Sequence, residues 1–247
     1  MASAARDILS SIGLSAAVVL VAVSVPPTAA NAALACGASS CTETVSFGGL
    51  TDLNNAILTL DKFTPAANQT LVDVNVSFNG SFFSNGSLTN TSSSTQTFHF
   101  IESTDFTFTA GAGAPPNFLT APFDISGNSG LLPFTLASGA SAPVGINFSL
   151  PTGNLGTITS NLGGFIGPGT FQTLASTLTD ENFVGGGGNI NASLVSGATP
   201  IVTITYDFRV NSGIPEPSTW AMVLLGFTCV GFVAYRRRNS TTTFRSV

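Results

Sequence analysis

The chain has 247 residues, of which only 8% are charged, and its formal net charge is −5 at pH 7. Between residues 33 and 213 the only basic side chains are Lys62 and Arg209. Nucleic-acid binding needs cations that neutralise phosphates. We therefore expect no nucleic-acid partner, and we expect hydroxyl and amide side chains to keep this stretch soluble.

The N-terminus has the features of a secretory signal peptide. An apolar stretch, "IGLSAAVVLVAVSV", runs from Ile12 to Val25, and the small residues Ala30-Asn31-Ala32 that follow fit a signal-peptidase site. We expect residues 1–32 to be removed and the mature chain to start near Ala33. An uncleaved N-terminal anchor is the alternative, and the Pro26-Pro27 break disfavours it.

The cysteines also fit export. Cys36 and Cys41 follow the expected cleavage site, and an oxidising compartment would favour a disulfide between them. The alternative is that both cysteines are free thiols in a loose N-terminus. The stretch "ALAC" resembles a lipoprotein box, so lipidation is a weaker second alternative. His99 is the only histidine and is far from both cysteines, so no metal site is expected. Cys229 lies within the C-terminal apolar run and is interpreted there as a small apolar side chain.

The middle of the chain alternates between apolar and polar residues with a period of two, which predicts half-buried antiparallel strands. The alternation is clearest at 72–78, 98–108, 144–150 and 202–210. The residues expected to face the core are Val72, Val74, Val76, Phe78, Phe98, Phe100, Phe106, Phe108, Val144, Ile146, Phe148, Leu150, Val202, Ile204, Tyr206, Phe208 and Val210. Weaker strands are expected at 44–47, 82–88, 132–136, 171–178 and 190–194.

Glycine-, proline- and asparagine-rich segments separate these strands. They are "NGS" at 79–81 and 85–87, "AGAGAPPN", "SGNSGLLP", "GGFIGPG" and "GGGG". Short strands with regular turns predict an all-β fold, an antiparallel β-sandwich over residues 33–213. The stretch "DLNNAILTLDKF" fits either a short helix or a strand. Residues 163–169 and 185–188 are expected to be mobile loops.

The C-terminal run from Thr219 to Tyr235 has no charged residue and predicts a transmembrane helix of roughly 26 Å. A buried globular helix is the alternative, but the run has no polar face. Arg236, Arg237 and Arg238 follow it, so the positive-inside rule places the tail 239–247 in the cytoplasm and makes the arginines a stop-transfer signal. The prolines at 215 and 217 predict that the helix starts after them, with Ser218 as N-cap.

No catalytic constellation stands out. The lone His99 lies between two phenylalanines that are expected to face the core, so its own side chain should face solvent. Asp180-Glu181 would suit a glycosidase pair or a cation site, but adjacent strand residues point to opposite faces. We therefore expect this doublet to be solvated in a loop before "GGGG". The glycine runs lack the Lys-Ser/Thr ending of a phosphate loop, so we expect neither enzymatic activity nor a cofactor.

The segment from Pro215 to Arg238 resembles the PEP-CTERM sorting signal of Gram-negative exported proteins, because Pro215-Glu216-Pro217, an apolar span and an arginine cluster occur in that order. The resemblance implies signal peptidase and an exosortase as processing partners, with cleavage near the Pro-Glu-Pro motif. It also implies transient inner-membrane anchoring with a periplasmic ectodomain, then release to the cell surface or an exopolysaccharide matrix. The segment 214–238 would be the sorting signal.

The body of the chain is similar to the choice-of-anchor E domain family through "LDKFTPAANQTLVDVNVSFNGSF", "LTNTSSSTQTF" and "VTITYDF". That resemblance implies a bacterial surface domain and supplies no catalytic residues. The expected role is therefore structural or adhesive, with exopolysaccharide or other surface proteins as candidate partners.

Two other functions stay open. A carbohydrate-binding module needs exposed aromatic rings, which Phe82 or Phe83 would have to supply. A hydrolase of extracellular polymers needs two carboxylates at a suitable separation on one surface.

Overall fold

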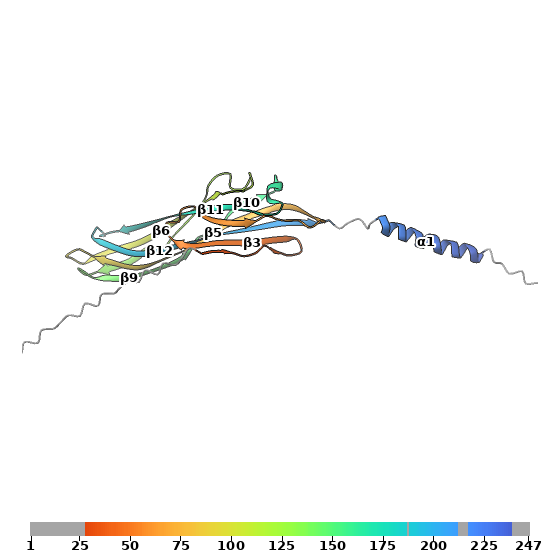
Figure 1. Cartoon of the computed structure of the whole chain (residues 1–247). Helices are drawn as coiled ribbons and strands as arrows, with labels where there is room; N and C mark the ends of the chain where they lie inside the picture. Colours follow the sequence, from red (N-terminus) through yellow and green to blue (C-terminus); the bar gives the residue numbers. More distant parts are fainter. Residues whose placement is uncertain (1–27, 187, 212–216, 239–247) are drawn as a thin grey trace, which may run out of the picture.

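The protein is an all-β sandwich followed by one apolar helix (Figure 1). The computed structural model describes residues 28–186, 188–211 and 217–238. The elements are β1 (Thr28–Asn31), β2 (Ala35–Cys36), β3 (Ser40–Leu50), β4 (Ala56–Asp61), β5 (Gln69–Asn90), β6 (Gln96–Ala110), β7 (Phe123–Asn128), β8 (Leu132–Leu136), β9 (Ser141–Ser149), β10 (Gly153–Ile158), the short 3₁₀ helix η1 (Leu162–Phe165), β11 (Thr170–Val184), β12 (Ile190–Val210) and α1 (Pro217–Arg238).

The strands form two antiparallel sheets. Sheet A has the order β1-β3-β12-β5-β10, with β2 also paired to β3 and β9 also paired to β5. Sheet B has the order β4-β11-β6-β7, with β8 also paired to β6. The expected antiparallel β-sandwich is therefore confirmed. Long strands dominate it, because β5 has 22 residues and β12 has 21, whereas strands of about 5 to 6 residues are usual.

Phenylalanine fills the space between the sheets, and the predicted parity holds for most strands. The side chains of Phe98, Phe100, Phe106 and Phe108 from β6 are buried, and so is Tyr206 from β12. Rings from the two sheets meet directly: the centroids of Phe78 and Phe108 are 4.7 Å apart. Such aromatic contacts add to the free energy gained from burial.

Two residues expected in the core are exposed. Val72 is 40% exposed because β5 carries a bulge there. Asp207 pairs with Asp73 but Phe208 pairs with Leu71, so Val72 is the extra residue and points outward. Val210 is 47% exposed because it is the last residue of β12 and extends past the core.

Both "NGS" segments lie inside β5, so their prediction as turns is wrong. Their glycines serve close packing instead. A Cβ at Gly80 would come within 2.8 Å of Phe106 Cε1, and one at Gly86 within 2.0 Å of the Ser193 carbonyl oxygen. Real Cβ atoms do not approach other atoms this closely. Glycine at position 80 therefore leaves room for the Phe106 ring, and glycine at position 86 lets the backbones of β5 and β12 approach.

The ambiguous "DLNNAILTLDKF" segment contains β4, which pairs with β11. The segment 163–169, expected to be mobile, is anchored: Phe165 is fully buried and Lys62 N donates to the Gly169 carbonyl. Gly185, Gly186 and Gly188 lie in the connection between β11 and β12, while Gly187 is outside the described residues.

The C-terminal helix is longer than expected, because α1 starts at Pro217 and includes all three arginines, Arg236 to Arg238. The prediction that it starts after Pro217 is wrong. Proline is well suited to the first helical position, where its missing N–H has no partner to lose.

The predicted signal peptide is only partly within the described residues. Residues 1–27 are outside them, whereas Thr28–Asn31 form β1 and pair with Val45–Gly48 of β3. Ala32 N also donates to the Thr44 carbonyl at 3.1 Å. In the full-length chain, the region before the expected cleavage site therefore contributes an edge strand to sheet A.

Candidate functional site

The predicted sorting motif falls at the junction between the sandwich and α1. β12 ends at Val210 and α1 begins at Pro217, and this interval can span at most about 25 Å when fully extended. Pro215 and Glu216 lie outside the described residues, and Pro217 is the first residue of α1. The motif is therefore held near both the folded domain and the apolar helix by chain length alone.

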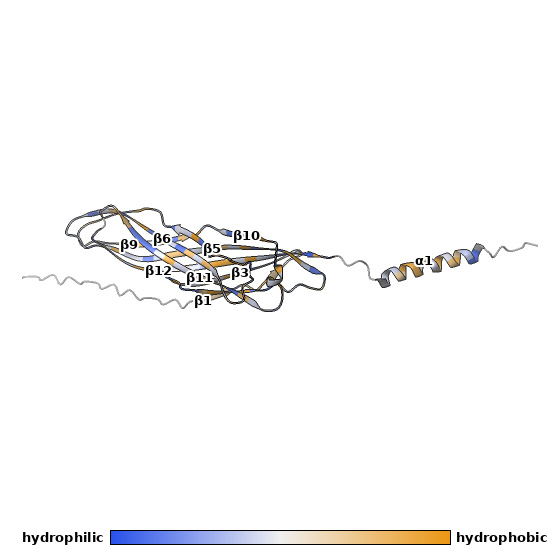
Figure 2. Ribbon diagram, turned by 90° about the horizontal axis from the view of Figure 1, so that it is seen from above, coloured by the Kyte–Doolittle hydropathy of each residue, from blue (hydrophilic) through white to orange (hydrophobic). Residues whose placement is uncertain are grey.

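The helix α1 is long and apolar enough to cross a membrane over Ser218–Arg237, and no part of that span is buried against the protein. Figure 2 shows the apolar character along most of the helix, with a polar C-terminal end. Arg236 and Arg237 are exposed at that end. The apolar stretch of α1 is exposed, which contradicts its interpretation as a core helix and is consistent with membrane anchoring.

The two N-terminal cysteines are bonded. Cys36 of β2 and Cys41 of β3 are paired opposite each other in the sheet and form a disulfide. Cys41 belongs to the core cluster, so the bond ties the start of the domain to its interior. Cys229 is a free thiol exposed on α1.

The sequence-predicted polar candidates fall on β6 and β11. His99 is exposed on the outer face of β6, as its parity predicts. Asp180 and Glu181 lie within β11, so their placement in a loop is wrong. They point to opposite faces, and Glu181 is paired directly with Glu102 of β6 on the inner face.

Glu102 is the functional candidate that sequence reasoning missed. Its side chain is 0% exposed, and Ser196 Oγ lies 2.8 Å from its Oε1. Burial raises the pKa of Glu102, the Ser196 and Ser84 hydroxyls lower it, and the charge of Glu181 raises it further. The signal was present in the sequence, because Glu102 falls on the same parity as the core phenylalanines of its strand.

A groove beside Glu102 opens between the sheets. It has a volume of about 390 Å³ and is lined by Leu50, Thr51, Asp52, Thr179, Glu181, Leu194, Val195 and Ser196. Asp52 Oδ1 accepts a hydrogen bond of 2.9 Å from Thr179 N, which ties the β3–β4 connection to β11. Two carboxylates, Asp52 and Glu181, thus line one groove, which is the first of the two features that the hydrolase alternative needs.

Two further acidic clusters involve β12. On the outer face of sheet A, Asn75 Nδ2 donates to Asp73 Oδ1 at 2.9 Å and to Asp207 Oδ2 at 3.1 Å. Burial raises the pKa of Asp73, and its hydrogen bond and charge interaction with Asp207 raise it further. Carboxylates in direct contact are closer than the roughly 5 Å or more that glycoside hydrolysis uses, so this pair is not a candidate for that chemistry.

The second of these clusters lies inside the sandwich. Glu43 is almost fully buried, and its Oε2 accepts a hydrogen bond of 2.7 Å from Asp61 N. Burial raises the pKa of Glu43 despite that bond. Tyr206 donates to the Asp61 carbonyl at 2.6 Å, so both buried groups have partners and the cluster reads as structural.

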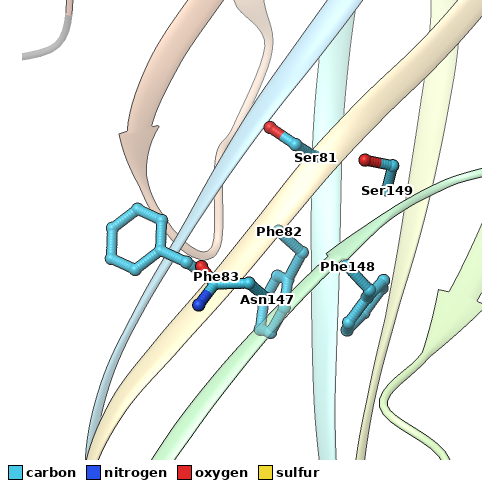
Figure 3. A pocket seen from close by; sticks show the side chains of 6 residues that line it. All are labelled: Ser81, Phe82, Phe83, Asn147, Phe148 and Ser149. Atoms are coloured by element: carbon cyan, nitrogen blue, oxygen red, sulfur yellow. The ribbon is translucent and has the colours of Figure 1, made fainter.

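A hollow where β5 and β9 pair contains the aromatic residue that a sugar site would need (Figure 3). It has a volume of about 380 Å³ and is lined by Ser81, Phe82, Phe83, Asn147, Phe148 and Ser149. Phe82 is buried, and its ring lies against that of Phe148 in a tilted arrangement with centroids 5.0 Å apart, whereas Phe83 points away from both and is half-buried. Of the two candidate phenylalanines, only Phe83 is placed to meet a ligand.

Within residues 28–186, 188–211 and 217–238, no three histidine, cysteine, aspartate or glutamate side chains gather closely enough to hold a metal ion. Any cation site in this part of the chain would have to use hydroxyl or carbonyl oxygens beside one or two carboxylates.

Comparison with known proteins gives no family. No protein-family profile and no curated protein sequence matches the chain. Two solved virus particles show weak likeness. The structure of the infectious bursal disease virus Gt strain has 10% identity over 82% of this chain and 50% of its own, with a TM-score of 0.14. The T13 particle of the same virus has 11% identity over 74% and 42%, with a TM-score of 0.13.

This chain thus spans half or less of the length of those viral chains. Their TM-scores establish neither a shared fold nor a shared function. The class defined by this molecule's own features is an antiparallel β-sandwich with a C-terminal helix able to span a membrane.

Proposed function

We propose that the protein is an exported, non-enzymatic surface or matrix protein that its C-terminal helix holds temporarily in the inner membrane. An exosortase then processes it at Pro215-Glu216-Pro217 and releases the sandwich towards the cell surface. The observation that carries this proposal is the fully exposed apolar helix α1, which follows the last strand after the short interval that contains the motif.

The physical argument rests on position. A helix that crosses the bilayer, with its arginines on the cytoplasmic side, holds its N-terminal end at the outer surface. The motif then lies where an integral-membrane enzyme can reach it, beside a domain that is complete without it. The Cys36–Cys41 disulfide suits an oxidising compartment outside the cytoplasm.

Replacing Pro215, Glu216 and Pro217 with alanine should leave a full-length protein in the membrane with a folded sandwich. The wild-type protein should instead be shortened and released. Fractionation of the native host, followed by blotting against the sandwich, measures both. Ser212→Ala, in the same connection but outside the motif, is the matched control and should be processed normally.

Changing Arg236, Arg237 and Arg238 to serine tests the anchor separately, since it should impair retention or orientation before any cleavage. Release of the triple motif variant at the wild-type rate would show that the sorting proposal is wrong and that α1 is only a tail anchor.

The hollow around Phe83 favours a second candidate, a carbohydrate-binding role for the sandwich. Ring stacking on a sugar should contribute about 1 kcal/mol, so Phe83→Ala should weaken binding to the host's exopolysaccharide about tenfold or less. Affinity electrophoresis in gels that contain the polysaccharide measures this change. Val72→Ala, an exposed apolar residue of the same strand, should have no effect. Equal retardation of the two variants would remove Phe83 as the sugar contact.

A further inference from the structure

Six oxygen-bearing side chains occupy inward positions of the two sheets in one part of the sandwich. We call them the inter-sheet oxygen cluster. They are Glu102 and Thr104 of β6, Thr179 and Glu181 of β11, Ser84 of β5, and Ser196 of β12. Ser84, Glu102 and Thr104 are buried, whereas Glu181 is exposed and lines the groove. Protein interiors normally contain polar groups only where each has a partner. Apolar packing alone therefore does not account for these polar side chains at inward positions.

The cluster members from sheet B form two cross-strand pairs. Glu102 lies directly opposite Glu181, and Thr104 directly opposite Thr179. Directly opposed residues of antiparallel strands have Cβ atoms about 5 Å apart and point to the same face. Like charges in that arrangement destabilise a sheet. Two glutamates thus share one inner face with nothing on sheet B to separate their charges.

Serines of sheet A cover this face. Ser84 and Ser196 are paired opposite each other in β5 and β12. Ser196 Oγ lies 2.8 Å from Glu102 Oε1 and 2.9 Å from Ser84 Oγ. These contacts show that a hydroxyl of sheet A meets the Glu102 carboxylate of sheet B within the cluster.

The cluster is incomplete in hydrogen bonding. Glu102 Oε2, Thr104 Oγ1 and Thr179 Oγ1 are buried and have no hydrogen-bond partner. Each such atom costs about 1 to 3 kcal/mol when it stays unpaired. An unpaired oxygen of the buried Glu102 carboxylate, together with unpaired hydroxyls on the neighbouring pair Thr104 and Thr179, points to a bound species that interacts with these oxygens.

No cationic side chain of the described residues is near enough to supply that charge. Lys62 is anchored beside Gly169, roughly 30 Å along β11 from Thr179. Arg209 is paired with Thr70, roughly 40 Å along β12 from Ser196. His99 is exposed on the outer face of β6, away from the cluster.

Solvent has a path to the cluster. The groove of about 390 Å³ that opens between the sheets is lined by three members, Thr179, Glu181 and Ser196. Asp52 adds a carboxylate to the same groove. An ion from outside can therefore reach the cluster past acidic residues, and a hydrated ion fits within this volume.

We propose that the inter-sheet oxygen cluster binds one calcium ion between Glu102 and Glu181. The donors are all oxygen, which selects a hard cation over zinc or copper. Two carboxylates balance a charge of +2, and hydroxyls and water complete the shell. The irregular arrangement suits calcium, which accepts varied geometries, better than magnesium, which demands a near-ideal octahedron.

The test uses the full-length protein in detergent after washing with a chelator. Adding calcium well above its dissociation constant should raise the Tm by about 5 °C, and calorimetry should give one site. Magnesium at the same concentration should raise it less. Thermal melting followed by far-UV circular dichroism measures the Tm, since strands dominate the signal.

Two substitutions locate the ion. Glu181→Gln changes an exposed side chain and should leave the fold intact while it abolishes the calcium shift. Glu102→Gln removes a buried charge, so it should raise the Tm in chelator at pH 7.5 and also abolish the calcium shift. Asp180→Asn, one residue away but on the outer face, is the matched control and should keep the full shift.

Three results would overturn the proposal. They are the absence of a calcium shift in the wild type, a shift that persists in Glu181→Gln, and a loss of the shift in Asp180→Asn equal to that in Glu181→Gln. The first result combined with a higher wild-type Tm at pH 5 than at pH 7.5 would show that a proton on Glu102, rather than calcium, offsets the buried charge.

Discussion

Phe208→Asp should unfold the sandwich or reduce its free energy of unfolding by about 5 kcal/mol, which is comparable with the whole stability of many domains. Phe208 is only 4% exposed, and its ring stacks on Phe63 with centroids 5.4 Å apart. The substitution removes this ring and places a charge without a partner in an apolar layer. Thermal or urea unfolding of the full-length protein in detergent measures the loss.

Thr205→Asp is the matched control on the same strand. Thr205 is half-buried on the outer face, and its Oγ1 lies 3.1 Å from Thr42 Oγ1. The new carboxylate keeps access to water, so the cost should be about 1 kcal/mol, from the poorer strand propensity and the lost hydroxyl contact. Equal losses in the two variants would contradict the inward and outward assignment of β12.

The sequence predicted the parity of the strands well because burial of one sheet face imposes a period of two. The phenylalanines of β6 all face inward as expected. The outward position of Val72 was not predicted, because a bulge depends on the register between two strands. That register cannot be inferred from the sequence of one strand. The register changes between Asp207 and Phe208 of β12, far away in the chain.

The lengths of β5 and β12 were not predictable from local turn chemistry. Asn-Gly is a strong hairpin signal when it joins two strands that pair with each other. Here both "NGS" segments pair with β12 instead, because β12 continues past them without a break in register. Long-range pairing thus overrides a local preference, and the glycines are retained for the space that they leave.

The two candidate sites also differ in whether a local sequence pattern contains them. The proposed sorting motif is a local pattern that the sequence alone suggests, and Pro217 lies inside α1 rather than before it. The inter-sheet oxygen cluster comes from four strands, so no local pattern contains it. Its one local sign is a glutamate at an inward position, Glu102, between phenylalanines of the same parity.

Gly86→Ala should reduce the free energy of unfolding by about 3 kcal/mol and lower the Tm by about 6 to 12 °C. The new Cβ would lie 2.0 Å from the Ser193 carbonyl oxygen and 2.9 Å from Leu194 Cα. Both atoms belong to the backbone of β12, so no side-chain rotation relieves the clash. The strands must move apart at this point, which weakens the ladder between β5 and β12.

Gly145→Ala provides the comparison within the same part of sheet A. Gly145 pairs with Asn85, next to Gly86, but a Cβ there would meet only Asn85 Oδ1 at 3.6 Å, an ordinary contact. Alanine also reduces the conformational freedom of the unfolded chain, so this variant should be neutral or more stable by about 0.5 kcal/mol. Thermal melting of both variants by circular dichroism decides the matter. If Gly86→Ala melts at the temperature of Gly145→Ala, the backbones of β5 and β12 do not approach as closely as described, and the "NGS" segment has another role.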